Sequence, residues 1–148
     1  MSKRSAYGLG LDFGTNTVRA LLVDVRNGRE TATAVVAYPS GRDGIILDPK
    51  NPELARQNPD DYLVAVEAAV RKTLAAARRA DASFSPARVV GLGVDTTGST
   101  PLPVDAQGAP LSRRKEFRRN PNAMAWLWKD HTGFAEAAEI TALAAAEH

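Results

Sequence analysis

The first part of the chain alternates apolar and small or polar residues with a period of two, which predicts β-strands. Three such runs cover residues 7–12, 18–25 and 31–38. Asn27-Gly28, between the second and third runs, is a strong hairpin signal. The chain is therefore predicted to open with a three-stranded meander that has Asp12 at its first bend.

The pattern changes to the period of a helix over residues 59–79. Asn58 is predicted to cap the start of this helix, with Pro59 at its first position. The apolar residues at helical spacing are Tyr62, Val66, Val70, Leu74 and Ala77. Two further helices are predicted over residues 123–130 and 134–146.

Residues 88–95 form a nearly continuous apolar run, which is typical of a strand covered on both faces. A short strand is predicted at 101–104, with a turn at 105–108. Residues 39–59 contain four prolines and are predicted to be a long irregular loop. A meander, a helix and a further strand together indicate an α/β domain.

Composition narrows the function classes. The chain has 148 residues, enough for a hydrophobic core, and a formal net charge of +2, too small to indicate a nucleic-acid or membrane partner. It has no cysteine, which excludes a disulfide scaffold, a thiolate nucleophile and cysteine-ligated metal. Its only histidines, His131 and His148, do not form a histidine-rich metal site. No apolar run reaches membrane-spanning length and the polar start does not resemble a secretory signal, so we expect a cytoplasmic protein.

The first candidate site is Asp12-Phe13-Gly14-Thr15-Asn16-Thr17-Val18-Arg19. A carboxylate at a strand end can hold Mg²⁺, and a glycine turn lets backbone N–H groups approach phosphate oxygens. Arg19 is suited either to a phosphate or to an ion pair with Asp12. The segment is not a Walker P-loop, because no Gly-Lys-Ser/Thr follows the glycine. Residue types alone leave an ordinary polar hairpin equally open.

The second candidate is Asp95-Thr96-Thr97-Gly98-Ser99-Thr100, directly after the apolar run. Ligands commonly bind at such strand ends, and hydroxyl groups suit a polyhydroxylated ligand. Taken alone, the segment is better explained as an ordinary turn.

The third candidate is Trp126-Leu127-Trp128-Lys129-Asp130-His131. An indole ring can cover the apolar face of a sugar while polar neighbours bind its hydroxyls. On the predicted helix the two tryptophans point in different directions, so at most one lines a given pocket.

A basic cluster, Arg113-Arg114-Lys115 with Arg118-Arg119, lies in a polar loop. A nucleic-acid patch is one interpretation, but the small net charge and the lack of interleaved aromatic residues favour a solvated loop.

Three segments together resemble the FGGY carbohydrate kinases. Residues 10–20 are similar to the phosphate-binding opening of that family, and residues 90–105 and 120–132 are similar to its ribulokinase group. The order and spacing of the segments match, and the resemblance covers almost the whole chain. It implies a ribonuclease-H-like fold of the actin/hexokinase/Hsp70 superfamily.

The resemblance also implies ATP-dependent phosphorylation of L-ribulose to L-ribulose 5-phosphate, in L-arabinose breakdown, with Mg²⁺. The residues implied at the ATP phosphates are Asp12, which also binds the metal, with Gly14, Thr15, Asn16 and Arg19. Those implied at the sugar are Thr97, Gly98, Trp128, Lys129 and Asp130. Other FGGY kinases, of xylulose or glycerol, and a non-catalytic sugar-binding fragment are the alternatives.

Family members are several times longer than 148 residues. The resemblance places their catalytic Asp in a later part of the first domain and their adenosine pocket in the second. We therefore expect residues 1–148 to be an incomplete N-terminal part of the first domain, with no catalytic base of its own and no activity when isolated. An incomplete sheet would leave an open apolar edge, which favours self-association into a homo-oligomer.

Overall fold

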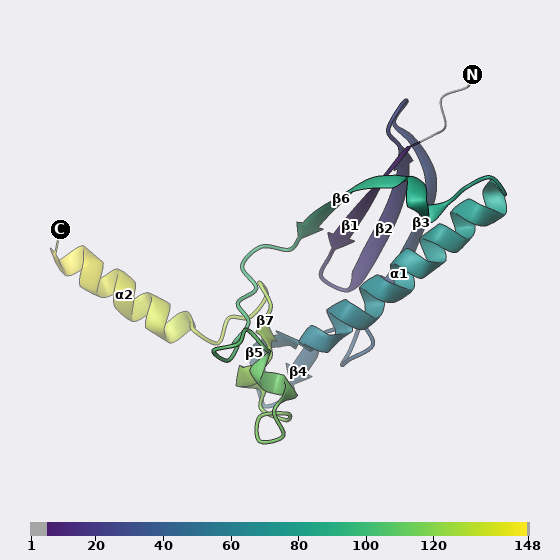
Figure 1. Ribbon diagram of the computed structural model, residues 1–148. Helices are drawn as coiled ribbons and strands as arrows, with labels where there is room; N and C mark the ends of the chain where they lie inside the picture. Colours follow the sequence, from purple (N-terminus) through teal and green to yellow (C-terminus); the bar gives the residue numbers. More distant parts are fainter. Residues whose placement is uncertain (1–5, 148) are drawn as a thin grey trace.

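The computed structural model describes residues 6–147, so the polar start and His148 lie outside the described residues. A four-stranded sheet forms the body of the molecule (Figure 1). Its strands, in spatial order, are β3 (Arg29–Ala37), β2 (Thr17–Asp24), β1 (Tyr7–Phe13) and β6 (Val89–Thr96). The first three are antiparallel neighbours, which confirms the predicted meander, and β6 runs parallel to β1.

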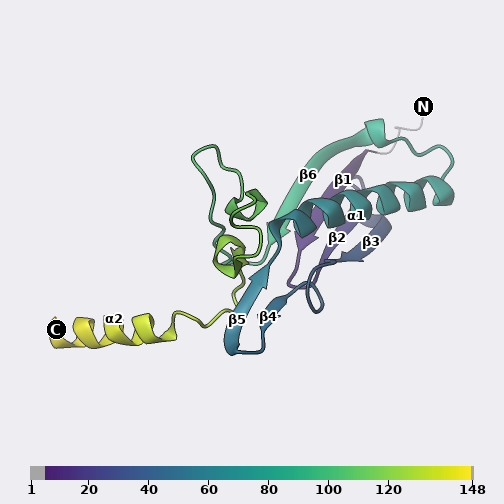
Figure 2. The same ribbon diagram turned by 90° about the horizontal axis from the view of Figure 1, so that it is seen from below.

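Helix α1 (Pro59–Ala80) covers one face of this sheet (Figures 1 and 2). Its start is the predicted one, since the Asn58 side chain accepts a hydrogen bond from the backbone N–H of Asp60 at 3.1 Å. The fully buried stripe consists of small residues, Ala65, Ala69, Thr73 and Ala77, which let the helix lie close to the strands. The larger apolar residues that were predicted, Tyr62, Val66, Val70 and Leu74, flank this stripe and pack against the core.

The prediction of an irregular loop over residues 39–59 is wrong. This segment contains β4 (Ile46–Asp48) and β5 (Asn51–Gln57), which form a second sheet with β7 (Ala125–Trp126) in the order β4-β5-β7. The helix predicted over residues 123–130 is therefore also wrong: a 3₁₀ turn (Pro121–Ala123) leads directly into β7. Pairing with a strand about 70 residues earlier overrides the local helical pattern.

Strand β6 has the predicted position, but it is not covered on both faces. Val90, Leu92 and Val94 are 69%, 61% and 58% exposed. The strand lies at the edge of the sheet, and α1 packs over β2 and β3 instead. The apolar run therefore predicted the strand correctly. The prediction that both faces are buried is wrong, because the composition of a strand does not show which elements pack against the strand.

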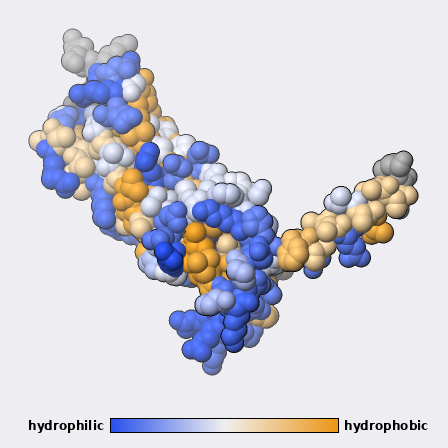
Figure 3. All heavy atoms as spheres, turned by 180° about the vertical axis from the view of Figure 1, so that it is seen from behind, coloured by the Kyte–Doolittle hydropathy of each residue, from blue (hydrophilic) through white to orange (hydrophobic). Residues whose placement is uncertain are grey.

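The last third of the chain has little regular structure. The strand predicted at 101–104 is reduced to a single bridge between Val104 and Pro110, around the predicted turn. Two other 3₁₀ turns cover Pro86–Arg88 and Leu111–Arg113. Helix α2 (Phe134–Glu147), which was predicted, projects from the body with residues 134–146 exposed (Figures 1 and 3). Among residues 6–147, no helix has both the length and the apolar character needed to cross a membrane.

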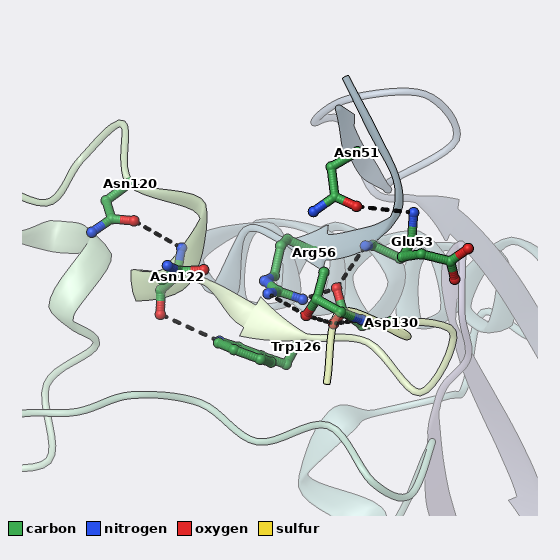
Figure 4. A network of polar contacts seen from close by, with 9 residues as sticks. Asn51, Glu53, Arg56, Asn120, Asn122, Trp126 and Asp130 are labelled. Carbon is green, nitrogen blue, oxygen red and sulfur yellow. Dashed lines mark hydrogen bonds and ion pairs between the residues drawn. The ribbon is translucent and has the colours of Figure 1, made fainter. Parts of the chain in front are cut away.

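A buried ion pair joins the second sheet to the segment after β7 (Figure 4). The side chains of Arg56 and Asp130 contact each other and are 1% and 4% exposed. The Arg56 guanidinium also lies 3.6 Å from the ring centroid of Trp126. The Asp130 carboxylate accepts further hydrogen bonds from the backbone N–H groups of Ala55 at 2.8 Å and Thr132 at 3.2 Å. This network fastens two distant segments of the chain to each other.

We expect Asp130→Ala to lower the free energy of unfolding by about 3 to 5 kcal/mol, because it leaves the Arg56 charge buried without a partner. Urea unfolding followed by circular dichroism measures the change. The matched control is Glu67→Ala, which breaks an exposed ion pair with Arg71 and is expected to cost about 0.5 kcal/mol or less. A loss below about 1 kcal/mol for Asp130→Ala would contradict this role of the ion pair.

Candidate functional site

The first two candidate segments meet at one edge of the main sheet. Strands β1 and β6 are parallel and end side by side, and the backbone N–H of Thr97 donates to the carbonyl oxygen of Phe13 at 3.0 Å. In the register of the sheet, Asp12 is opposite Arg19 on β2 and opposite Asp95 on β6. Three charged residues from three strands therefore lie at one level of the sheet.

Asp12, Arg19 and Asp95 line a hollow of about 400 Å³ on the sheet face opposite α1. Gly93 also lines it, and a Cβ placed there would meet no heavy atom within 4 Å. Within the described chain no ion pair links Arg19 to Asp12, so the ion-pair interpretation of Arg19 is not what the structure shows. An unpaired guanidinium beside carboxylates suits a phosphate that carries a divalent cation.

This donor set fits Mg²⁺ held together with a phosphate-bearing substrate. Residues 6–147 contain no group of three or more His, Asp or Glu that would cage a metal on its own. Mg²⁺ typically keeps several waters and binds through one or two carboxylates plus substrate phosphates. Asp12 and its neighbour Asp95 supply that number of carboxylates.

A second cavity, of about 300 Å³, lies beside the same strand ends. Gly14 and Thr97 line it together with the aromatic residues Phe13, Tyr38 and Tyr62. Burial raises the pKa of Tyr38 above its ordinary value and that of Tyr62 to about 12, so both phenols stay protonated at neutral pH. Within the described residues, the buried Tyr38 hydroxyl has no hydrogen-bond partner. An apolar cavity with a few unsatisfied hydroxyl groups suits a small polyhydroxylated ligand.

Trp128 connects the third candidate segment to the first. Its indole N–H donates to Thr15 Oγ1 at 3.1 Å, across 113 residues of sequence. The Thr15 carbonyl oxygen accepts from Gln57 Nε2 at 2.7 Å, and the Tyr62 hydroxyl donates to Gln57 Oε1 at 2.7 Å. Lys129 Nζ lies 5.2 Å from the Trp128 ring centroid. The hairpin after β1 is thus held from two sides.

The other predicted residues occupy different surroundings. The Asn16 side chain donates to the Asp43 carbonyl oxygen at 2.6 Å, and the Gly14 N–H donates to the Thr17 carbonyl oxygen at 2.9 Å. Gly98 is exposed and has open space at its Cβ position. The carboxylate of Asp130 is taken up by the buried ion pair. The structure therefore places Asp12 opposite Arg19 and joins Trp128 to Thr15, whereas the Asp130 carboxylate is buried against Arg56.

Sequence reasoning missed Gln57, Tyr38 and Tyr62. Tyr38 directly precedes the segment that was predicted to be a loop, and Gln57 lies within that segment. Tyr62 was predicted only as an apolar helix position. The signal for Gln57 was present: polar Arg56-Gln57 directly precedes the cap of α1. Both residues are about 1% exposed, and buried polar side chains need partners.

Comparisons with known proteins show which family this chain resembles. The model of the N-terminal domain of the FGGY family of carbohydrate kinases matches residues 7–142. A ribulokinase of Vibrio parahaemolyticus is 45% identical over 136 residues, which are 92% of this chain and 23% of that protein. A ribulokinase of Geobacillus thermodenitrificans is 38% identical over 143 residues, which are 94% of this chain and 24% of that protein.

The comparison with solved structures also finds carbohydrate kinases, as the comparison of sequences does. A xyloylose kinase from Brucella ovis superposes with a TM-score of 0.68 at 26% identity, over 93% of this chain and 24% of that one. A gluconate kinase from Lactobacillus acidophilus reaches a TM-score of 0.67 at 14% identity, which shows a shared fold. The chain thus spans less than a quarter of the length of these kinases. The family model matches nearly the whole chain, so the chain belongs to the FGGY family of carbohydrate kinases.

Proposed function

We propose that this chain supplies the phosphate-facing hairpin and part of the sugar pocket of an ATP-dependent kinase that converts L-ribulose to L-ribulose 5-phosphate. The observation that carries the proposal is the hydrogen bond from Trp128 to Thr15, which ties the sugar-type segment to the phosphate-type hairpin. The identity of 45% to a protein named ribulokinase supports the choice of sugar. The structural neighbour named a xyloylose kinase makes xylulose the second candidate.

In this proposal the ATP phosphates lie against the hollow that contains Asp12 and Arg19. Asp12 would hold Mg²⁺, Arg19 would contact a phosphate, and Gly14, Thr15 and Asn16 would line the hairpin beside it. Bound Mg²⁺ would neutralise phosphate charge, which is a principal requirement of phosphoryl transfer. Thr15 is fixed by two hydrogen bonds before any ligand arrives, so its position costs no ordering on binding.

The sugar, in the same proposal, lies over the cavity that Thr97 lines, and Gly98 is the next residue along the chain. The ring of Trp128 is 51% exposed and offers an apolar face, with Lys129 beside it. Asp130 was expected to contact the sugar as well. Its buried ion pair favours a positioning role, in which it holds the Trp128 segment in place.

We further propose that these residues are an N-terminal part of a ribonuclease-H-like first domain. The aspartate that accepts the proton of the sugar hydroxyl and the adenosine pocket would then come from the longer kinase. The 148-residue chain alone is expected to form no ADP above background with ATP, Mg²⁺ and L-ribulose, because phosphoryl transfer needs both substrates held in line. A coupled ADP assay with the purified chain measures this; ribulose-dependent turnover would contradict it.

The choice of sugar is tested by a chimera in which this chain replaces the matching N-terminal segment of the Vibrio parahaemolyticus ribulokinase. We expect ribulose-dependent ADP formation, with kcat/KM at least about tenfold lower for D-xylulose and glycerol. Trp128→Phe in the chimera removes the indole donor to Thr15 and is expected to lower kcat/KM by about two- to tenfold.

The matched control is Trp126→Phe, since Trp126 contacts Arg56 and has no bond to Thr15. A preference of the chimera for xylulose would overturn the assignment to ribulose. An unchanged kcat/KM in Trp128→Phe would show that the hydrogen bond from Trp128 to Thr15 does not contribute to the activity.

A further inference from the structure

The basic cluster noted in the sequence borders a cavity that the proposed kinase site does not use. This cavity measures about 440 Å³ and lies between the 3₁₀ turn Leu111–Arg113 and the start of α1. Its polar lining consists of Asn58, Asp60, Ser112, Arg113, Lys115 and Arg118. Neither Asp12 nor Thr97 lines it, so it is separate from both cavities described above.

The charges around this cavity are unbalanced. The Arg113 guanidinium is neutralised by Asp60, whose Oδ1 lies 2.6 Å from Arg113 Nη2. Arg114 does not line the cavity, and its guanidinium forms an ion pair with Asp105 at 3.0 Å. Lys115 and Arg118 have no ion-pair partner within residues 6–147. Three cations and one carboxylate therefore line the cavity, an excess of two positive charges.

Ser112 gives an independent sign that a ligand belongs here. The residue is only 8% exposed, and its Oγ is buried with no hydrogen-bond partner in the described chain. A buried hydroxyl without a partner is unfavourable, and native structures rarely leave one. An oxygen of a bound anion would accept a hydrogen bond from it while Lys115 and Arg118 neutralise the charge.

The start of α1 adds to the positive field. The helix has 22 residues, and its positive end lies at the cavity, where Asn58 is one of the lining residues. The N–H of Asp60 is already bonded to the Asn58 side chain, so the helix contributes its dipole to the cavity and no direct hydrogen bond there. The volume is in the range of small-molecule sites and exceeds what a single phosphate fills.

We propose that this cavity binds the phosphate group of a small phosphate monoester. The dianionic phosphate matches the two excess positive charges, Ser112 donates to it, and the remaining volume takes the organic part of the molecule. The proposal does not depend on the sugar chosen above or on catalysis by this chain.

Titration of the ¹⁵N-labelled 148-residue chain with inorganic phosphate tests the site, with ribose 5-phosphate and ribose as parallel arms. We expect saturable amide shifts at Ser112, Lys115 and Arg118 with both phosphates and none with ribose. Arg118→Gln is expected to weaken the affinity by about tenfold and Ser112→Ala by about threefold or more. The matched control is Lys72→Gln, the same loss of charge on the exposed side of α1, with a change below about twofold.

Several results would overturn the proposal. Equal weakening by Lys72→Gln and Arg118→Gln would indicate diffuse attraction, and shifts confined to residues 14–19 would indicate phosphate at the hairpin only. Equal binding of ribose would show that the phosphate is not recognised. Tighter binding of a single-stranded oligonucleotide, with shifts extending to Arg119, would indicate a nucleic-acid surface. If Ser112→Ala does not fold, the exposed variant Lys115→Gln carries the same test, with about tenfold weakening expected.

Discussion

The side chains of Arg56 and Asp130 are almost entirely removed from water, and each is the other's charged partner. A buried charge is tolerated only with such a partner, so β5 and the segment after β7 cannot separate without a large penalty. The residues next to this pair hold the site. Gln57 follows Arg56 and bonds to the Thr15 carbonyl, and Trp128 precedes Asp130 by two positions and bonds to the Thr15 side chain. The geometry of the phosphate-type hairpin therefore depends on an ion pair that itself lies outside the hairpin.

Local signals in the sequence were enough for the elements that are stabilised locally. The Asn27-Gly28 turn, the Asn58 cap and the period of α1 predicted the meander and the main helix within a few residues. Strand β7 was predicted as a helix because its strand conformation comes from pairing with Arg56, far away in the chain. The strands within residues 39–59 were missed for the same reason, since prolines there suggested a loop and the partner strand was not visible.

The residues of the candidate site could be named from the sequence, but their arrangement in space could not. Residue types and the family resemblance pointed to Asp12, Arg19, Thr97 and Trp128, and the structure places them around the ends of β1 and β6. Spacing along the chain gave no sign that Trp128 donates to Thr15. It also gave no sign that the Asp130 carboxylate pairs with Arg56, because residue type and spacing do not show whether a carboxylate is exposed or buried.

The distance along the chain that the Trp128 bond spans has a consequence for how the molecule forms. The meander closes through short connections, whereas the Thr15 bond joins residues 113 positions apart and the Asp130 bond to Ala55 spans 75. Closing long loops is entropically slow, so such contacts follow the local ones during folding. During synthesis all four strands of the main sheet leave the ribosome before Trp128 does, because β6 ends at Thr96. The hairpin between β1 and β2 would thus form early, and the Trp128 side chain that bonds to it would join later.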